Sequence, residues 1–471
     1  MIALSLAELA TLAGGMLAQG DPAAVVLGPV VTDSRRVVHG SVFVAIKGER
    51  FDGHDFAEQA VADGAVAVLA ERVVGSVPTV LVDHVVAALG RLAHGVLGQL
   101  PSTTVIALTG SSGKTSTKDL VAGLLETVGP TVSAAGSYNT EIGLPLTVLA
   151  ASADTAFLVL EMGARGLGHI SELTRIAPPA VGVVLNVGSA HLGEFGSREV
   201  IAEAKAELVA AVPPGGLAVL NADDPLVAAM RGQTSARVVT FGTSSTADVR
   251  AEGVEMASGL ARFLLVCPDG SAAVQLQLFG EHQVANALAA AAVGLSAGLS
   301  VDAVAAGLGA ARPRSRWRME VTERPDGVTV VNDAYNANPE SMRAALHALV
   351  DLAGARRSWA VLGEMRELGP AAAAVEHDAA GRLAVTLGVS HLVVVGQGAR
   401  GIHLGAGLAA GGRTHSVFVT DNDAAVALLA AEIVPGDVVL LKASRAAGLE
   451  QVAEALLSPT PAPAPVEGAA P

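Results

Sequence analysis

The sequence of 471 residues contains one cysteine, Cys267, and only 3% aromatic residues. A single cysteine supports neither a disulfide framework nor a cysteine-based zinc site, so we expect Cys267 to be a small buried residue. Basic residues are also few: 30 lysines and arginines stand against 45 acidic residues, and no long basic run occurs. Nucleic-acid binding needs a clustered basic face, so the composition argues against that class. Single nucleotides are not excluded, because backbone N–H groups, one lysine and a metal ion can hold them.

Long apolar runs are missing too. The apolar stretch at residues 288–301 is too short to cross a bilayer, which takes about 20 residues. Residues 1–20 are apolar, but they have no basic start and include Glu8, which is not the pattern of a signal peptide. We therefore expect a cytoplasmic protein that is not embedded in a membrane.

Aliphatic residues, by contrast, are abundant. Hydrophobic residues make up 51% of the chain, mainly Val, Leu and Ala, in alternating strand-like and helix-like segments. This alternation predicts an α/β fold with parallel sheets. We expect strands at residues 42–46, 66–69, 104–108, 156–160, 181–185, 328–331, 359–362, 392–395 and 438–441. We expect helices at residues 85–100, 118–127, 200–211 and 283–295.

The chain length suggests about three domains, at roughly 150 residues per domain. Pro101 interrupts the pattern after residue 100, and a basic, proline-containing segment begins at Arg312. The domains that we predict are a small α/β domain at residues 1–100, a central parallel-sheet domain with a phosphate-binding loop at 101–311, and a Rossmann-like domain at 312–457. Residues 458–471 are rich in Pro and Ala and are expected to form a disordered tail.

The strongest chemical signal is the loop TGSSGKT at residues 109–115, between a predicted strand and a predicted helix. Glycines let the backbone curl so that successive N–H groups face phosphate oxygens, and the helix N-terminus adds a favourable dipole. Lys114 would reach the β- and γ-phosphates, and the Thr115 hydroxyl would ligate Mg²⁺. The general P-loop pattern has glycine where Leu108 stands, so the shorter form of the motif applies. The alternative is an ordinary Gly/Ser turn.

Two candidate metal ligands, Glu161 and His191, follow predicted strands, at the sheet edge where ligands bind. The Glu161 carboxylate could hold Mg²⁺, which prefers oxygen ligands, although a strand-end glutamate in water is the alternative. A lone histidine such as His191 is more often structural than a ligand. Lys205 lies on a predicted helix between Glu203 and Glu207, and this spacing alone favours a solvated lysine on a charged helical face.

Several longer motifs occur in order along the chain. They are DSR at residues 33–35, KGERFDGHDF at 47–56, ALTGSSGKT at 107–115, YNTEIGLPLT at 138–147, GEHQVANA at 280–287, VNDAYNANPESM at 331–342, VLGEMRELG at 361–369 and KASR at 442–445. Together they resemble the Mur ligases of peptidoglycan synthesis over nearly the whole chain, and most closely the MurF type, with residues 331–342 the most specific stretch. Ala443 stands where the family usually has glycine, and Asn332 where some members have aspartate, which puts fine substrate contacts in doubt.

The resemblance implies a role for each domain. The first would bind a UDP-sugar peptide, the central one would bind ATP, and the third would close over the ATP and bring the amine substrate. The implied nucleotide contacts are Thr109, Gly110, Ser111, Ser112, Gly113, Lys114, Thr115, Ser116, Asn286, Arg318 and Asp333. The implied ligands of one or two Mg²⁺ ions are Thr115, Glu161, His191 and Lys205. The implied contacts to the UDP substrate are Ser34, Arg35, Lys47, Asn139 and Thr140, and those to D-alanyl-D-alanine or for closure are Tyr335, Asn336, Asn338 and Ser444.

The resemblance also implies a mechanism with Lys114, Lys205 and His191 as catalytic residues. Lys205 matches a lysine that family members carry as a carbamate, an anionic oxygen ligand suited to a second Mg²⁺. The carboxylate of UDP-N-acetylmuramoyl-tripeptide would attack the γ-phosphate of ATP to give an acyl phosphate and ADP. The amine of D-alanyl-D-alanine would then displace phosphate. All substrates are small molecules, and a monomer is expected.

Two alternatives stay open. A sister ligase, such as the one that adds the third residue or a folylpolyglutamate synthase, shares the phosphate loop but lacks the NANP stretch at residues 336–339. A non-catalytic nucleotide-binding regulator would not need Glu161, His191 and Lys205 together. The sequence leaves open whether the third residue of the tripeptide is diaminopimelate or lysine.

Overall fold

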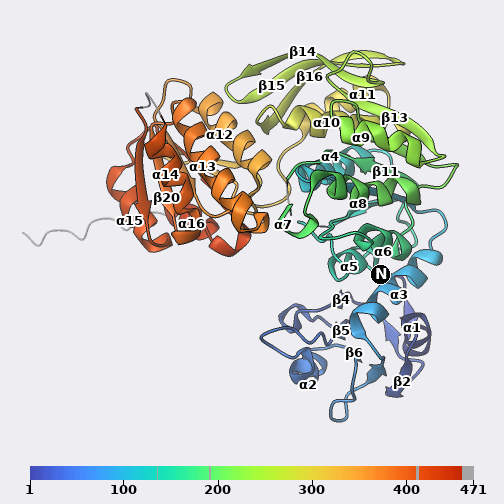
Figure 1. Ribbon diagram of the computed structural model, residues 1–471. Helices are drawn as coiled ribbons and strands as arrows, with labels where there is room; N and C mark the ends of the chain where they lie inside the picture. The colour runs from blue at the N-terminus through green and yellow to red at the C-terminus, as the bar shows by residue number, and fades with distance from the viewer. Residues whose placement is uncertain (135, 190–191, 410–412, 459–471) are drawn as a thin grey trace, which may run out of the picture. The chain divides into compact units, whose positions relative to one another are not determined.

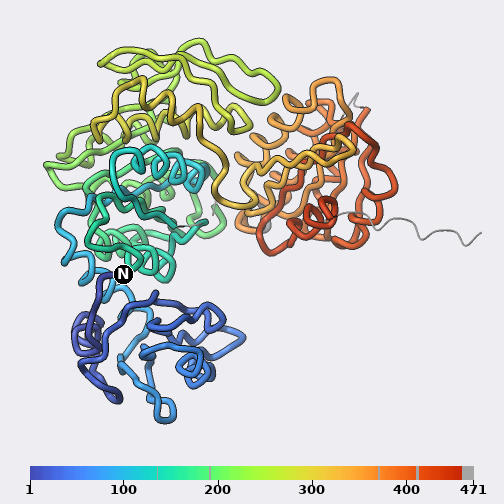
Figure 2. The backbone as a smooth tube through the Cα atoms, turned by 180° about the vertical axis from the view of Figure 1, so that it is seen from behind, coloured from blue at the N-terminus to red at the C-terminus, as the bar shows by residue number. Residues whose placement is uncertain are grey.

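The computed structural model describes residues 1–134, 136–189, 192–409 and 413–458 (Figures 1 and 2). These residues form two compact units. The first contains residues 1–255, 261–278 and 282–315, and the second contains 256–260, 279–281 and the chain from residue 316 on. The α/β fold class is confirmed, whereas the domain boundaries after residues 100 and 311 stay predictions. Residues 459–471 of the expected tail lie outside the described residues.

The first segment of the chain builds a five-stranded sheet of order β2-β7-β6-β5-β4, in which only β2 runs antiparallel to its neighbour. Its strands are β2 (Met16–Gln19), β4 (Val30–Val31), β5 (Val42–Val44), β6 (Ala67–Ala70) and β7 (Thr79–Leu81). The other elements are β1 (Leu4–Ser5), α1 (Leu6–Ala13), β3 (Val25–Val26), η1 (Ser34–Arg36), η2 (Gly53–Phe56), α2 (Ala57–Ala62) and α3 (Val85–Gly98). Helix α1 begins at a capping box, in which Ser5 and Glu8 accept hydrogen bonds from each other's backbone N–H groups.

Helix α3 connects this sheet to the rest of the first unit. Its buried side chains include Leu89 and Leu92, and the helix contacts α1 as well as α5 (Gly143–Val148) and α6 (His169–Ile176). One apolar core therefore continues from Leu4 through α3 to the central sheet. This shared core is why the two segments form one compact unit.

The central sheet has nine strands in the order β16-β15-β14-β13-β12-β11-β8-β10-β9, and the seven from β9 to β14 are parallel. The strands are β8 (Thr104–Thr109), β9 (Thr131–Ser133), β10 (Phe157–Glu161), β11 (Val181–Val184), β12 (Leu217–Asn221), β13 (Arg237–Gly242), β14 (Val249–Ala257), β15 (Leu260–Cys267) and β16 (Gly270–Phe279). The middle strands are buried on both faces, which explains why they are continuous apolar runs in the sequence.

Helices cover both faces of this sheet (Figure 1). Helices α5, α6 and α8 (Arg198–Ala211) join the core on one face, which contains Leu158 and Val184. On the other face lie α4 (Lys114–Leu125) and α10 (Gln283–Ser296), with α11 (Val301–Ala310) packed against them. The short elements are α7 (Leu192–Phe195), α9 (Pro225–Ala228) and η3 (Ala229–Gln233). Because the strands are parallel, their carboxyl ends lie at one edge of the sheet, where ligands bind in such sheets.

The strands β14, β15 and β16 were not predicted. In β14 and β16 polar residues alternate with buried ones, so these two strands lack the continuous apolar run that marks the other strands. Strand β15 does contain an apolar run, at residues 263–267, and it was missed all the same. A two-residue turn joins β14 to β15, and both of its residues, Ser258 and Gly259, have positive φ, as a type I′ hairpin requires. Cys267 ends β15 and is buried, as expected.

The second unit contains a six-stranded sheet of order β17-β18-β22-β19-β20-β21, parallel except for β17. Its strands are β17 (Glu320–Glu323), β18 (Thr329–Asn332), β19 (Ser358–Leu362), β20 (His391–Val395), β21 (His415–Val419) and β22 (Val438–Lys442). The helices are α12 (Pro339–Ala353), η4 (Arg366–Leu368), α13 (Pro370–Thr386), η5 (Gln397–Ala399), α14 (Arg400–Leu408), α15 (Asn422–Glu432), η6 (Arg445–Ala447) and α16 (Glu450–Leu457).

Alternate residues of this sheet face different helices. Ala360 and Leu362 join the core under α12, α13 and α14, whereas Trp359 and Val361 join the core under α15 and α16. Two-sided coverage is the Rossmann-like arrangement that the sequence predicted for this region. Among the residues described in both units, no helix is long and apolar enough to span a membrane.

Candidate active site

The predicted phosphate loop connects β8 to α4. Gly113 caps the helix with φ +79°, a conformation that favours glycine, and α4 therefore starts at Lys114 rather than at residue 118 as predicted. Gly110 is needed for space, because a Cβ there would lie 2.9 Å from Leu185 Cβ. Thr109 ends the strand in a buried position, and Ser116 lies in the first turn of α4. The loop thus presents a helix N-terminus at the carboxyl edge of the sheet.

Asn186, which follows β11, holds the loop in shape. Its Oδ1 accepts hydrogen bonds from the N–H groups of Ser111 and Ser112 at 2.9 and 3.0 Å, and its Nδ2 donates to Ser112 O at 3.2 Å. Two of the N–H groups that we expected to face phosphate therefore face Asn186 here. A bound phosphate would use the remaining N–H groups of the loop or displace the Asn186 amide.

Lys114 lies across the loop, where its Nζ donates a hydrogen bond to Gly110 O at 2.7 Å. The next residue, Thr115, is buried, and its Oγ1 lies 2.8 Å from Glu161 Oε2 and 2.6 Å from Ser137 Oγ. Glu161 ends β10, and its other oxygen accepts a hydrogen bond from Asn139 Nδ2 at 2.7 Å. The structure therefore brings Thr115 and Glu161, both predicted as magnesium ligands, into direct contact.

Lys205 lies on α8 and is buried, with 5% of its surface exposed. The solvated lysine that the helical spacing favoured is therefore wrong, because α8 turns this side chain inward toward the sheet. Within the part of the chain that the structure describes, the Lys205 amine has no hydrogen-bond partner. Burial, together with the nearby charge of Lys114, lowers the pKa of Lys205 well below its ordinary value. Its neighbour Glu207 instead accepts hydrogen bonds from backbone N–H groups at the start of α6.

Three predicted residues of the first unit have different outcomes. Asn286 on α10 lies against the phosphate loop: its Oδ1 accepts from Thr117 Oγ1 at 3.2 Å, and a Cβ at Gly113 would lie 2.4 Å from that oxygen. His191 lies outside the described residues. Thr140 is exposed, and its Oγ1 accepts from the Gly143 N–H at 3.4 Å.

The predicted UDP-substrate residues of the first segment lie outside its sheet. Ser34 and Arg35 belong to η1. The Arg35 guanidinium forms a bidentate ion pair with Asp33, in which Nε lies 2.9 Å from Oδ1 and Nη2 lies 2.7 Å from Oδ2. Lys47 is exposed and begins a turn that closes at Asp52. These positions are accessible to a ligand, and their roles stay predictions.

Asp52 organises that turn, and it gives an expected pH dependence. It accepts hydrogen bonds from the His54 backbone N–H at 3.0 Å and from His54 Nδ1 at 2.6 Å, and these bonds lower its pKa to about 2. An unfolded aspartate titrates near 3.9, so the stabilisation is present above about pH 4 and is lost as the pH falls toward 2. Asp52→Asn should therefore lower the melting temperature at pH 7 by more than at pH 3. The exposed turn variant Asp269→Asn is the control, and an equal deficit at both pH values would contradict the assignment.

In the second unit, Asp333 forms a buried ion pair. Its Oδ2 lies 2.6 Å from Lys442 Nζ, which also donates to Asn336 O at 3.0 Å, and its Oδ1 accepts from the Met319 N–H at 3.1 Å. Burial lowers the pKa of Lys442, and the nearby Asp333 charge partly offsets that shift. Asp333 follows β18 and Lys442 ends β22, so the pair lies at the carboxyl edge of this sheet.

The other predicted residues of this unit make contacts of their own. The Arg318 guanidinium lies 3.9 Å from the centre of the Tyr335 ring, and both Trp317 and Met319 have positive φ, an uncommon backbone for side-chain-bearing residues. Asn338 caps α12 through the Ser341 N–H at 2.9 Å. Ser444 Oγ accepts from the Arg366 N–H at 3.0 Å.

Sequence reasoning did not single out three residues that contact predicted site residues, each within its own unit. They are Asn186, Ser137 and Lys442. Lys442 begins the recognised motif at residues 442–445, whereas Asn186 lies between the predicted strand at 181–185 and His191. Ser137 directly precedes such a motif. The available signal was proximity in sequence, whereas their partners are far away along the chain.

Comparison with known proteins agrees with this geometry. Three family models match the chain: the Mur ligase catalytic domain at residues 29–95, the Mur ligase middle domain at 108–294, and the Mur ligase, glutamate ligase domain at 317–445. The chain is 52% identical to the UDP-N-acetylmuramoyl-tripeptide–D-alanyl-D-alanine ligase of Mycobacterium tuberculosis, over 97% of this chain and 98% of that one.

Two solved structures are also similar. MurF from Acinetobacter baumannii superposes with a TM-score of 0.86 at 33% identity, covering 97% of this chain and 99% of that one. MurF ligase from Thermotoga maritima in complex with ADP gives a TM-score of 0.78 at 35% identity, covering 91% and 97%. The resemblance seen in the sequence motifs is thereby confirmed, and the chain belongs to the Mur ligase family.

Proposed function

We propose that this chain is an ATP-dependent ligase that joins D-alanyl-D-alanine to UDP-N-acetylmuramoyl-tripeptide, with release of ADP and phosphate. The product would be the UDP-linked pentapeptide precursor of peptidoglycan. The observation that carries the proposal is the 52% identity, over nearly the full length of both chains, to a relative that bears this ligase's name. We further propose a cytoplasmic monomer, which cell fractionation and sedimentation can test.

The residues of the first unit support the phosphoryl-transfer step. Lys114 would offset the charge of the β- and γ-phosphates while the carboxylate, itself an anion, approaches the γ-phosphorus. Thr115 and Glu161 offer hard oxygen atoms 2.8 Å apart, a donor set that fits Mg²⁺. Bound there, Mg²⁺ would neutralise part of the phosphate charge. Ser137 and Asn139 would orient these two ligands through their hydrogen bonds.

Phosphorylation of the carboxylate has a clear chemical purpose. A free carboxylate is a poor acyl donor because its oxygen is a poor leaving group, and the acyl phosphate provides phosphate as a better one. The incoming amine attacks as the neutral base and forms a tetrahedral intermediate that expels phosphate. Because water would hydrolyse the acyl phosphate, we propose that the third domain, residues 312–457, closes over the site.

The remaining roles are proposals of the same kind. We propose that Asn286 contacts adenine and that Arg318 and Asp333 lie near the ribose and phosphates. We propose that the UDP substrate is bound by Ser34, Arg35, Lys47, Asn139 and Thr140. We propose that D-alanyl-D-alanine binding or domain closure depends on Tyr335, Asn336, Asn338 and Ser444. Support comes from the exposed loops of the first segment and from the buried Asp333–Lys442 pair, which fixes the loop after β18.

Lys205 is proposed to carry a carbamate that provides an oxygen ligand for a second Mg²⁺. Carbamate formation needs a neutral amine, and burial lowers the pKa of Lys205 toward that state. We expect the enzyme in ¹³C-bicarbonate to show one carbamate carbon signal in NMR spectra, and Lys205→Gln to lose both the signal and most of the activity. A signal that persists in Lys205→Gln would place the carbamate elsewhere, and full activity in that variant would remove Lys205 from the mechanism.

The decisive experiment measures phosphate release by the purified full-length chain. Release should require ATP, D-alanyl-D-alanine and a UDP-tripeptide together, and comparing tripeptides with diaminopimelate and lysine would define the third residue. Release that requires a single amino acid in place of the dipeptide would indicate a sister ligase. ATP binding without release under any of these conditions would indicate a nucleotide-binding regulator.

A further inference from the structure

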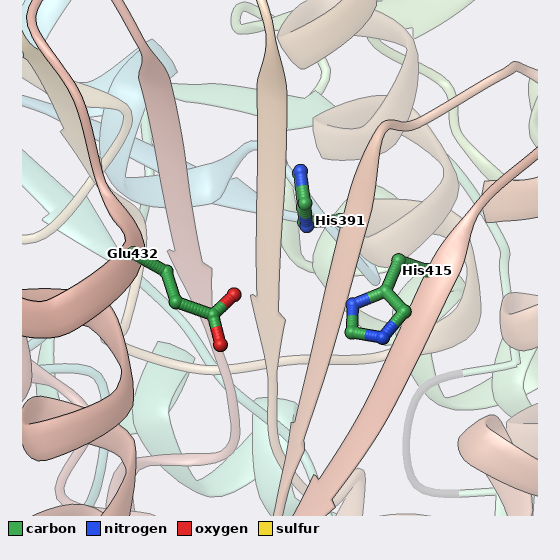
Figure 3. Close-up of side chains that lie close together, drawn as sticks. All are labelled: His391, His415 and Glu432. Atoms are coloured by element: carbon green, nitrogen blue, oxygen red, sulfur yellow. The ribbon is translucent and has the colours of Figure 1, made fainter.

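Three side chains of the second unit, far from the residues discussed above along their sheet, point toward a common space. They are His391, His415 and Glu432 (Figure 3). One ligand atom from each lies within 4.8 Å of the other two. His415 and Glu432 are exposed and His391 is half-buried, so the cluster is open to solvent.

The fold brings this cluster to a defined edge of the sheet. His391 is the first residue of β20, His415 is the first residue of β21, and the two are direct neighbours in the parallel register. Glu432 is the last residue of α15. Asp333 and Lys442 lie at the opposite, carboxyl ends of the strands, so the cluster is not part of the proposed ligase site.

The three side chains have no competing partners. Among the described residues, none of them makes a side-chain hydrogen bond or ion pair, and His391 Nδ1 is a buried atom that lacks any partner. The His391 ring is nevertheless fixed in place, because it stacks on the buried Trp359 ring at 4.0 Å and 10°. A fixed ring with unused nitrogen atoms, beside two adjustable side chains, has the arrangement of a metal site before binding.

The surrounding charges permit such a role. Arg357 is the nearby cation, but it is engaged by Asp437 at 2.9 Å and donates to Glu432 O at 3.0 Å, so its charge is already matched. Burial, then the charges of Arg357 and His415, lower the pKa of His391, while Glu432 and Asp437 act in the opposite direction. The lowered pKa favours the neutral imidazole, which is the form that binds a metal ion.

The ligand set selects the class of ion. Two imidazoles and one carboxylate suit Zn²⁺ and related transition-metal ions, which accept three protein ligands and keep a fourth position for water. Bond lengths of about 2.0–2.2 Å would place tetrahedral ligand atoms roughly 3.4 Å apart. The ligand atoms of His415 and Glu432 must therefore move roughly 1 Å closer to one another and to His391. Both side chains are exposed, so they can make this movement.

We propose that His391, His415 and Glu432 bind a divalent transition-metal ion of the zinc class at the amino-terminal edge of this sheet. The ion would tie β20 and β21 to the end of α15. It would thereby stabilise the second unit, because a ligand that binds only the folded state shifts the folding equilibrium.

The test uses the full-length chain, stripped of metal by a chelator and kept in excess Mg²⁺ to occupy hard-ion sites. Calorimetric titration with Zn²⁺ should show one equivalent bound. His415→Gln and Glu432→Gln should each weaken that binding by at least about tenfold. His347→Gln, at an exposed histidine on α12, is the matched control and should bind as the wild type does. His415 and Glu432 are exposed, so both variants should fold.

A second readout locates the ion. Co²⁺ should quench tryptophan fluorescence through Trp359, the ring against His391, in the wild type and in His347→Gln but not in His415→Gln. Undiminished Zn²⁺ affinity in His415→Gln would overturn the proposal, as would the absence of Zn²⁺ binding in the wild type. Zinc binding that disappears only in Glu161→Gln would place the ion at the phosphate loop and would overturn it equally.

Discussion

Replacing Lys114 with alanine is expected to lower substrate-dependent ADP release by at least about a hundredfold. The reaction that we propose brings two anions together, and Lys114 is the only lysine in the loop that we propose to hold the phosphates, residues 109–115. Lys205 cannot substitute for it, because its buried amine has a lowered pKa and is not a dependable cation. The hydrogen bond from Lys114 Nζ to Gly110 O would be lost, and such a bond contributes about 1 kcal/mol to stability.

The control for this variant is binding of the UDP substrate, which should be unchanged because the residues proposed to hold it lie outside the loop. Lys114→Met, which keeps most of the side-chain stem without the charge, should behave as the alanine variant does. Retained turnover in either variant would remove Lys114 from the mechanism. A joint loss of turnover, UDP-substrate binding and the melting transition would show a folding defect instead.

The parts of the molecule that the sequence predicted well depend on neighbours along the chain. The phosphate loop is one continuous segment, and the strands next to it are apolar because both faces of the sheet are covered. Glu161 could be chosen because it ends such a strand. The strands β14 and β16 were missed because polar residues alternate along them, a weaker pattern than an apolar run.

The parts that could not be predicted depend on contacts between distant segments. Asn186 supports the loop from 74 residues away, and Lys442 pairs with Asp333 across 109 residues. The spacing of Lys205 between two glutamates indicated a solvated face, yet tertiary packing turned that position inward. The composition offered one further signal: the chain has only five lysines, so a lysine on a helix is less easily explained as one of many solvated surface residues. Three of the five, Lys118, Lys205 and Lys442, are buried.

The buried Lys442 provides the second large expected effect. Lys442→Met should destabilise the second unit by about 3–5 kcal/mol, because it leaves the Asp333 carboxylate buried without its cation. Asp333 would keep only the Met319 N–H as a hydrogen-bond donor among the contacts described here. The Asn336 carbonyl would lose a donor as well. Removing one partner of a buried pair costs more than the pair itself contributes, since the remaining charge has no access to water.

Fluorescence can follow this unit selectively, because both tryptophans of the chain, Trp317 and Trp359, lie in it. Urea unfolding monitored by tryptophan emission should show the lower stability of Lys442→Met. Arg382→Met is the control: Arg382 pairs with Asp378 at 2.6 Å on the surface of the same unit, where such a pair contributes at most about 1 kcal/mol. If Lys442→Met lowers the free energy of unfolding by no more than Arg382→Met does, the Asp333 carboxylate has access to solvent or to another cation.

A double variant separates stability from catalysis. Replacing both partners, as Lys442→Met with Asp333→Leu, removes the uncompensated charge and should recover most of the lost stability, since apolar residues of similar size can replace a buried pair. Turnover should stay low, because Asp333 is proposed to lie near the nucleotide. Recovery of both properties would show that the pair serves the fold alone, whereas recovery of stability without turnover would assign Asp333 to the site. The stability measurement and the ADP-release assay therefore answer different questions about the same two residues.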